Sequence, residues 1–315
     1  GLLDLLLLPA RHGVATSRIE QAQLRLSAEV VDQVTRVRQA WVRAVAAQQA
    51  LHYARQVYGS AAAAAELARR MQGVGNFNRL ERAREQAFYA DAATRLALAQ
   101  HQATASREEL VRELGLNEAQ AQALTLPERL PDLPKQPLDA QAVAGLATRA
   151  RLDIRLAQAT LEGAARAQGL TGITSVTDIE LTGRRNPVFD AASGTRSSPH
   201  GWEEATVRSA GSSLREGYSA YRTAYDVARH YRDEVVPLRQ RISEENQLRY
   251  NGMLIGTSEL LADARDQVNA VAGAVDALRQ FWLADAALRA SVIGRPVGTS
   301  LSATSSAPSG ADAGH

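Results

Sequence analysis

One stretch of this sequence is too long and too regular to fit inside a compact domain. Residues 14–71 contain no proline, and Gly59 is their only glycine. Small and branched apolar residues recur through the stretch at alternating steps of three and four, the pattern of a coiled-coil seam: Val30, Val34, Val37, Trp41, Ala44, Ala47, Leu51, Ala54, Tyr58, Ala61, Ala65 and Ala68. A helix of this length would extend for about 85 Å, so an elongated molecule is predicted.

The composition agrees with long helices rather than with a compact enzyme. Hydrophobic residues make up 45% of the 315 residues, but only 5% are aromatic, and there are four Phe and two Met. Such a shortage of large apolar side chains, with abundant Ala, Arg, Gln, Leu and Glu, is typical of coiled coils.

Charge and cysteine content exclude several function classes. The 36 basic residues exceed the 34 acidic ones by only two, which gives little support for nucleic acid as a partner. The absence of Cys excludes disulfides and thiolate metal sites. The six His residues do not stand at metal-ligand spacing, so we expect no metal site. The G-x-G at Gly73–Gly75 follows a helix and not a strand, so we expect no dinucleotide cofactor. The pairs of acidic residues are adjacent in sequence and point about 100° apart on a helix, so we expect no catalytic carboxylate site.

Turn and breaker residues divide the chain into seven segments. Two long helical hairpins are predicted at 14–114 and 214–293, with Pro237 as a kink in the second. Between them we expect a Pro-rich linker at 115–138, a helix at 139–170 whose N-cap is Asp139, and a segment at 171–213 with one β-prone piece. At the N-terminal end, residues 1–13 form a separate segment, in which Pro9 should end any helix. At the C-terminal end, we expect a disordered tail at 294–315.

The second hairpin repeats the first. Ala-Arg-Glu-Gln at 83–86 corresponds to Ala-Arg-Asp-Gln at 264–267, and the seam of Leu80, Ala83, Ala87 and Ala90 corresponds to Leu261, Ala264, Val268 and Val271 at the same offset of 181. Each copy therefore consists of a long helix, a glycine turn and a returning helix.

The alanine-rich seams also predict an oligomer. Burial stabilises by only about 0.8 kcal/mol per CH₂, so an alanine seam needs close neighbours on both sides along a long path. One chain has too few helices to surround every seam, and we infer that several chains tile a wall or tube.

These features together resemble the TolC-like outer-membrane efflux protein family. Residues 151–165 are similar to the family's R-P-D-[LI]-x-x-A-x-x-x-L-x-A-A helix, with Leu152 in place of the proline. Residues 249–252 and 259–265 are similar to its second hairpin tip, residues 126–134 to its Pro-rich connector, and Pro187-Val188-Phe189-Asp190 to the P-[LIV]-F-D motif before its descending helix.

The resemblance implies a mainly α protomer of two long coiled-coil hairpins, which joins a homotrimer in the outer membrane of a Gram-negative bacterium. The helices would form a periplasmic α-barrel that acts as a passive exit duct. A periplasmic adaptor (membrane fusion) protein would bind it and link it to an inner-membrane efflux pump. The pump would drive transport, so no enzymatic activity is implied.

The sequence departs from the family pattern in two places. Residues 1–13 would be the remnant of a first strand hairpin, with the first ascending helix absent. Only residues 182–186 separate the strand-like piece at 173–181 from Pro187, too few for two membrane strands of about nine to eleven residues each. The β-barrel at 171–213 is therefore expected to be truncated, and outer-membrane lipid is a partner only if the barrel is complete.

The resemblance places partner binding at the two hairpin tips, although glycines can also serve merely to reverse the chain. The tip residues are Gly73, Val74, Gly75, Asn76, Gly252, Met253, Leu254, Ile255, Gly256 and Thr257. Four charged residues beside the tips, Arg84, Glu85, Asp263 and Arg265, are candidates for gating ion pairs between subunits. Alternatively, they are ordinary solvated flanks of the coiled coil, where an ion pair contributes about 0–1 kcal/mol.

Two other functions stay open at this point. The chain could be a soluble helical scaffold that uses its hairpins only to hold partners, or a non-functional fragment of an efflux duct. The transported cargo cannot be deduced from the chain.

Overall fold

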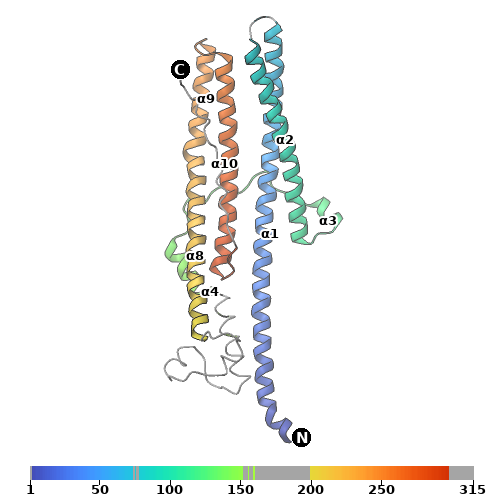
Figure 1. The fold of residues 1–315 in the computed structure, drawn as a ribbon, viewed down its shortest axis with the longest axis vertical. Coiled ribbons are helices and arrows are strands. Elements are labelled where there is room, and N and C mark those ends of the chain that lie inside the picture. Colours follow the sequence, from blue (N-terminus) through green and yellow to red (C-terminus); the bar gives the residue numbers. More distant parts are fainter. Residues whose placement is uncertain are drawn as a thin grey trace.

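The computed structural model describes residues 2–73, 75, 78–151, 155, 159 and 199–297. Within them the chain forms two long helical hairpins joined by an extended linker (Figure 1). The first hairpin consists of α1 (Leu2–Gly73) and α2 (Arg79–Leu114). The second consists of α8 (Pro199–His230), a π-helical turn η1 (Tyr231–Val235), α9 (Val236–Asn251) and α10 (Thr257–Val292). The short helices α3 (Glu118–Ala123) and α4 (Ala140–Ala150) come between the two hairpins in the sequence.

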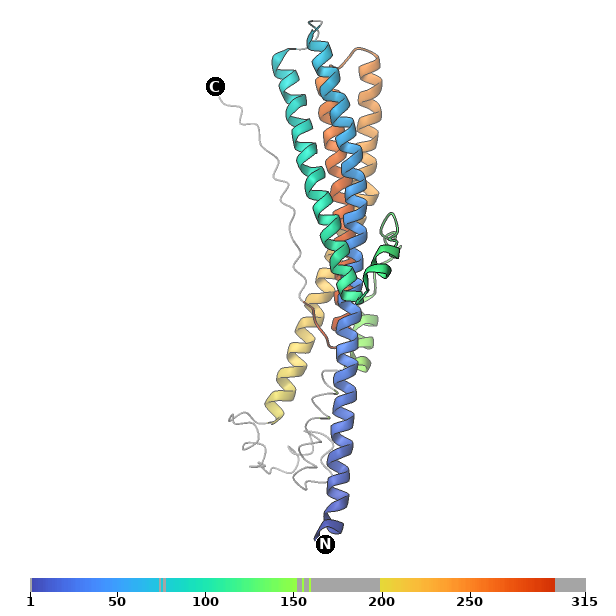
Figure 2. The same cartoon turned by 90° about the vertical axis from the view of Figure 1, so that its right-hand side faces the viewer.

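Both hairpin tips point to the same end of the molecule, as a duplicated module requires. Figures 1 and 2 show the α1–α2 turn and the α9–α10 turn side by side at the top, with the N-terminus at the opposite end. The two hairpins run alongside each other, and α10 packs against α1, α8 and α9. The architecture expected from the sequence, a mainly α chain of two long helical hairpins, is confirmed.

Two segments expected to contain strands are helical where the structure describes them. The helix α1 begins at Leu2, so residues 2–13 are not a strand remnant. Leucine is a strong helix former, and Pro9 removes a single backbone hydrogen bond without ending the helix. Similarly, α8 begins at Pro199, and residues 199–213 belong to a helix rather than to a β-barrel segment. Proline suits the first turn of a helix, where its missing N–H has no partner to lose.

The remainder of the expected barrel segment, residues 171–198, lies outside the described residues. The same holds for most of the helix expected at 139–170. Its first part is α4, which Asp139 caps by accepting hydrogen bonds from Gln141 N and Ala142 N at 3.0 Å. Arg155 and Ala159 are also helical. No described helix has both the length and the apolar character needed to cross a bilayer.

The kink expected at Pro237 takes the form of a π-helical turn just before it. Proline cannot donate to the carbonyl four residues earlier, and the backbone widens at Tyr231–Val235, where the N–H of Val236 bonds to Tyr231 O. The ring of Tyr231 then lies directly against α10 at Gly273. A Cβ at residue 273 would stand 2.7 Å from its Cε1, so only glycine leaves room for this approach.

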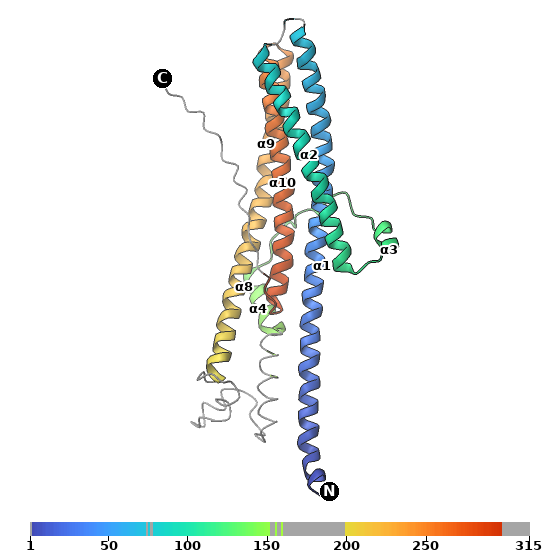
Figure 3. The same ribbon diagram turned by 45° about the vertical axis from the view of Figure 1, so that its right-hand side comes forward.

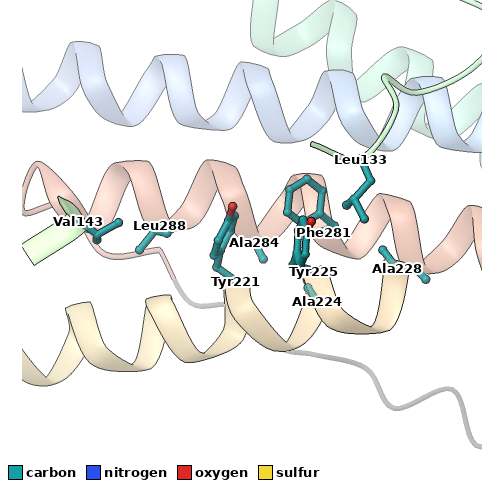
Figure 4. Close-up of a cluster of buried hydrophobic side chains, with 10 residues drawn as sticks. Leu133, Val143, Tyr221, Ala224, Tyr225, Ala228, Phe281, Ala284 and Leu288 are labelled. Carbon is teal, nitrogen blue, oxygen red and sulfur yellow. The ribbon is translucent and has the colours of Figure 1, made fainter. Parts of the chain in front are cut away.

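The largest core cluster lies between α8 and α10, well below the tips (Figure 4). Tyr221 and Tyr225 from α8 enclose Phe281 from α10, with ring centroids 5.5 and 5.8 Å apart. Leu133 enters the same cluster from the linker. Since this chain has few aromatic residues, their concentration here makes this level the most firmly packed part of the second hairpin.

The linker at 115–138 is a structural belt that ties the hairpins together. The indole N–H of Trp282 donates to Pro131 O, the hydroxyl of Tyr225 donates to Pro134 O, and that of Tyr218 to Leu138 O, each at 3.0 Å. On the other side, Leu130 N donates to Gln49 on α1 at 3.3 Å. A segment rich in proline thus obtains its hydrogen bonds from helix side chains.

The predicted apolar seams differ in how the single chain buries them. On α1, Ala44, Ala47, Leu51, Ala61 and Ala68 are buried as expected. The predicted seam of α2 is exposed, and Leu80 is 60% accessible. The residues that α2 does bury form a different face: Glu85, Ala92, Ala103, Ser106 and Leu110. The exposed seam of α2 is therefore free to contact another chain.

The tail expected to be disordered from residue 294 begins with an ordered turn. Gly294, at φ 89°, ends α10, and Arg295 N bonds back to Ala290 O at 2.9 Å. The guanidinium of Arg295 then forms a bidentate ion pair with Asp32 of α1. Residues 298–315 lie outside the described part of the chain.

Candidate functional site at the hairpin tips

The first tip is a short turn held by its own side chains. The N–H of Gly75, at φ 80°, donates to Gln72 O at 3.1 Å. Asn78 then starts α2 with a capping box, in which Glu81 N donates to Asn78 Oδ1 at 2.8 Å and Asn78 N to Glu81 Oε2 at 3.1 Å. Gly73 and Gly75 are exposed, whereas Val74 and Asn76 lie outside the described residues.

The second tip ends α9 with a Schellman motif. Met253 N bonds to Tyr250 O and Leu254 N bonds to Arg249 O, at 2.9 and 2.8 Å. The left-handed position of this motif is occupied by Met253, at φ 60°, and not by Gly252. Among the described residues, Met253 is the single non-glycine residue with positive φ. The same motif ends α2 and α10 with glycine in that position, at Gly115 and Gly294.

The second tip also presents large apolar side chains to solvent. Met253 is 94% and Leu254 73% accessible, Ile255 is half-buried and Gly256 is exposed. Gly256 precedes Thr257, the first residue of α10, whose side chain is not among those described. A strained methionine beside an exposed leucine is more than chain reversal requires, because glycine and polar residues would make the turn at lower cost.

Below the tips, a buried ion pair joins the two hairpins. Arg265 Nη2 on α10 lies 2.7 Å from Glu85 Oε1 on α2 (the neighbouring helices in Figure 3), with side-chain accessibilities of 28% and 4%. The guanidinium also lies over the ring of Phe88, 4.6 Å from its centroid. The alternative that these charged residues are solvated flanks is therefore wrong for Glu85 and Asp263, which are both buried, whereas Arg84 is exposed. The pair of Arg265 and Glu85 also forms within one chain, and not between subunits as expected.

This cluster is incompletely hydrogen-bonded within the chain. Two of its buried atoms, Glu85 Oε2 and Arg265 Nε, have no hydrogen-bond partner in the described structure, and the same is true of Asp263 Oδ2 elsewhere on α10. The sequence predicted two of its three residues, Glu85 and Arg265, as ion-pair candidates but missed Phe88, one of only four Phe in the chain.

Further polar contacts hold the tip regions in register. Arg95 on α2 donates to Asn269 Oδ1 on α10 at 3.2 Å. Within the second hairpin, Arg239 Nη1 on α9 lies 3.0 Å from Asp266 Oδ2 on α10. Among the described residues, no three His, Asp or Glu side chains gather in a way that would hold a metal ion.

Comparison with solved structures identifies the fold. The chain is similar to the outer-membrane channel OprN, with a TM-score of 0.70 and 17% identity over 91% of this chain and 71% of that one. It is also similar to the Campylobacter jejuni outer-membrane channel CmeC, with a TM-score of 0.71 and 12% identity over 89% of this chain and 66% of that one. The open state of the Neisseria gonorrhoeae outer-membrane channel MtrE has a TM-score of 0.68 and 18% identity, over 93% and 73% respectively.

By contrast, no family profile matches the sequence, and no curated protein is similar to it in sequence. The chain therefore has the fold of the TolC-like outer-membrane channels to which it is similar, as the resemblance implied. At identities of 12–18% the likeness concerns the fold.

Proposed function

We propose that this chain is a subunit of an outer-membrane efflux duct, a passive channel and not an enzyme. The observation that carries the proposal is the pair of parallel hairpins with adjacent tips, in a fold shared with outer-membrane channels over about nine tenths of the chain. Its place would be the outer membrane, with the helices in the periplasm. An adaptor protein would meet the tips and connect the duct to an inner-membrane pump.

Unpartnered helix faces support a homotrimer. The seam of α2 is exposed in the single chain, and none of the residues of α9 is buried, with Leu248 67% accessible. These two faces lie on different hairpins, so contact between α2 of one chain and α9 of the next would be head-to-tail. Head-to-tail contacts close into rings when the rotation allows it.

Cysteine cross-linking tests the ring. The chain has no Cys, so Ala87→Cys on α2 and Leu248→Cys on α9 can be combined and treated with a bifunctional maleimide in intact cells. We expect covalent trimers in the outer-membrane fraction from the double variant, and at most dimers from either single variant. The control is the double variant of Ala87→Cys and Leu26→Cys, in which the second cysteine lies far from the tips. We expect no covalent trimer from it. A soluble monomer would refute the proposal and favour a soluble helical scaffold.

The tip residues Gly73 to Asn76 and Gly252 to Thr257 are proposed as the adaptor contact. Leu254→Asp should weaken capture of a purified periplasmic adaptor, because it places a charge on the apolar tip. Leu26→Asp is the matched control, since Leu26 is also an exposed leucine but lies on the distant part of α1. Equal capture by the two variants would contradict the contact. The ion pair of Arg265 and Glu85, with Asp263 and Arg84, is proposed to hold the tip closed.

A further inference from the structure

A cleft of about 510 Å³ lies between the two hairpins, where α1, α2 and α10 meet. Its walls are mostly small apolar side chains, among them Ala50 and Ala54 on α1, Ala99 on α2, and Ala272 and Val275 on α10. Alanines stand where a three-helix core would ordinarily carry leucines, so the space between the helices is left open. The volume and the apolar walls are those of a small-molecule site.

The upper end of the cleft is polar. The hydroxyl of Tyr53 reaches Val268 O of α10, and Arg95 reaches the side chain of the next residue, Asn269. The two side chains, from α1 and α2, therefore converge on one turn of α10. Both line the cleft.

Both polar groups have hydrogen-bonding capacity left for a ligand, although Arg95 already donates to Asn269 at 3.2 Å. The bond from Tyr53 is 3.5 Å long, at the limit of a hydrogen bond. Burial raises the pKa of Tyr53, which keeps its hydroxyl a donor at neutral pH. The acid oxygen that pairs with Arg95, Asp91 Oδ2, is 4.0 Å away, beyond hydrogen-bond distance. A guanidinium in this state has donors for a carboxylate.

The rest of the cleft fits a linear chain. From Tyr53 down to Arg43, which lines the opposite end, α1 rises by about 15 Å. Arg43 is engaged by Glu109 at 2.7 Å, and Arg279 by Asp276. These two guanidiniums are neutralised by their acids, and the head-group position is therefore the upper end, at Arg95.

We propose that the cleft binds a linear anionic amphiphile, a medium-chain carboxylate, with its head group on Arg95 and Tyr53 and its alkyl chain along the alanine walls. The chemistry requires one negative charge and an unbranched apolar tail. Binding takes place within a single chain and does not depend on the proposed channel function.

Isothermal titration of the purified full chain with dodecanoate, below its micelle concentration, tests the site. We expect saturable binding of one molecule per chain, with weaker binding of dodecanol and of dodecyltrimethylammonium. Arg95→Gln should weaken dodecanoate binding about tenfold or more, because a charge-assisted hydrogen bond is lost. Arg55→Gln, which changes an exposed arginine of α1 outside the cleft, should leave it unchanged.

A second pair of variants tests the position of the tail. Ala272→Leu fills the cleft and should weaken dodecanoate binding about tenfold, whereas Ala83→Leu adds the same atoms to an exposed face of α2 and should not. Circular dichroism checks that both variants keep their helix content, and Ala50→Leu repeats the test from another wall. Non-saturable binding, equal binding of the three head groups, or binding unaffected by both Arg95→Gln and Ala272→Leu would overturn the proposal.

Discussion

Replacing Arg265 by Met tests whether the buried ion pair holds the hairpins together near the tips. The substitution keeps most of the apolar stem but removes the guanidinium that pairs with Glu85 and lies over the face of Phe88. Glu85, already with one oxygen unpartnered, would be left as an isolated buried carboxylate. Breaking a buried pair from one side costs about 3–5 kcal/mol. Because Arg265 is 28% accessible, we expect the low end, about 3 kcal/mol.

The assay is a double-mutant cycle in denaturant unfolding. Glu85→Leu combined with Arg265→Met removes both charges and should recover most of the loss, to within about 1 kcal/mol of the original chain. Arg84→Met is the matched control, since Arg84 is adjacent in sequence to Glu85 but exposed, and should change stability by less than about 0.5 kcal/mol. Should Arg265→Met cost no more than this control, the pair would have only the strength of a surface ion pair, and the argument from burial would fail.

Three further predictions concern other parts of the chain. Arg295 holds the pKa of Asp32 below its usual value, so the stabilisation is present above about pH 4 and is lost as the pH falls through the lower folded-state pKa; the protection of the Gly294 and Arg295 amides from hydrogen exchange, relative to their intrinsic exchange rates at each pH, should fall in acid, and Asp32→Asn should lower it already at neutral pH. Met253→Gly should raise the free energy of unfolding by about 1 kcal/mol, since it removes a left-handed non-glycine residue; no change in thermal unfolding would contradict this. Gly273→Ala should destabilise by about 1 kcal/mol because its Cβ would overlap the ring of Tyr231, but should stabilise by about 1 kcal/mol in a Tyr231→Ala background, where only helix propensity remains.

The long helices and their shared direction were predictable because they depend on local periodicity. Alternating steps of three and four from Val30 to Ala68 allow only a long helix. The repeat at an offset of 181 requires two equivalent turns, which place both tips at one end. By contrast, the starts of α1 and α8 were missed: Pro9 was expected to end any helix in residues 1–13, and residues 199–213 were assigned to the truncated barrel segment. Tertiary context and position within the helix decide whether a proline is tolerated.

The seam of α2 shows why periodicity could not identify the partner of a face. Alanines occur on several sides of this helix, among them Ala83, Ala87, Ala90 and Ala92. Leu80, Ala83 and Ala87 form a regular stripe, but the chain buries Ala92 and Glu85 instead. An apolar stripe predicts that this face of the helix is buried. It does not show whether the face packs against another helix of the same chain or of a neighbouring chain.

The belt and the ion pair depend on long-range contacts that a single sequence does not reveal. One signal was present: Tyr218, Tyr221 and Tyr225 are spaced by three and four and so share a face of α8. Their hydroxyls all bond with the belt, at Leu138, Pro134 and Lys135. Glu85 and Arg265 were both ion-pair candidates, but no spacing indicated that they pair with each other within one chain, because 180 residues separate the two.

Burial is distributed unequally along the molecule, and this bears on how the proposed duct can be stable and still open. At the level of the belt, Tyr221, Tyr225 and Phe281 are buried and hydrogen bonds join the linker to both hairpins. Above the π-helical turn, α9 buries no residue, and the described contacts between the hairpins are alanines, one ion pair and the hydrogen bonds of Tyr53 and Arg95. The free energy that holds a region together follows the apolar surface that it buries. Separating the hairpins at the tips therefore costs less free energy than separating them at the level of the belt. A hairpin with leucines in place of these alanines would lose this difference, since its tips would be packed as firmly as its base.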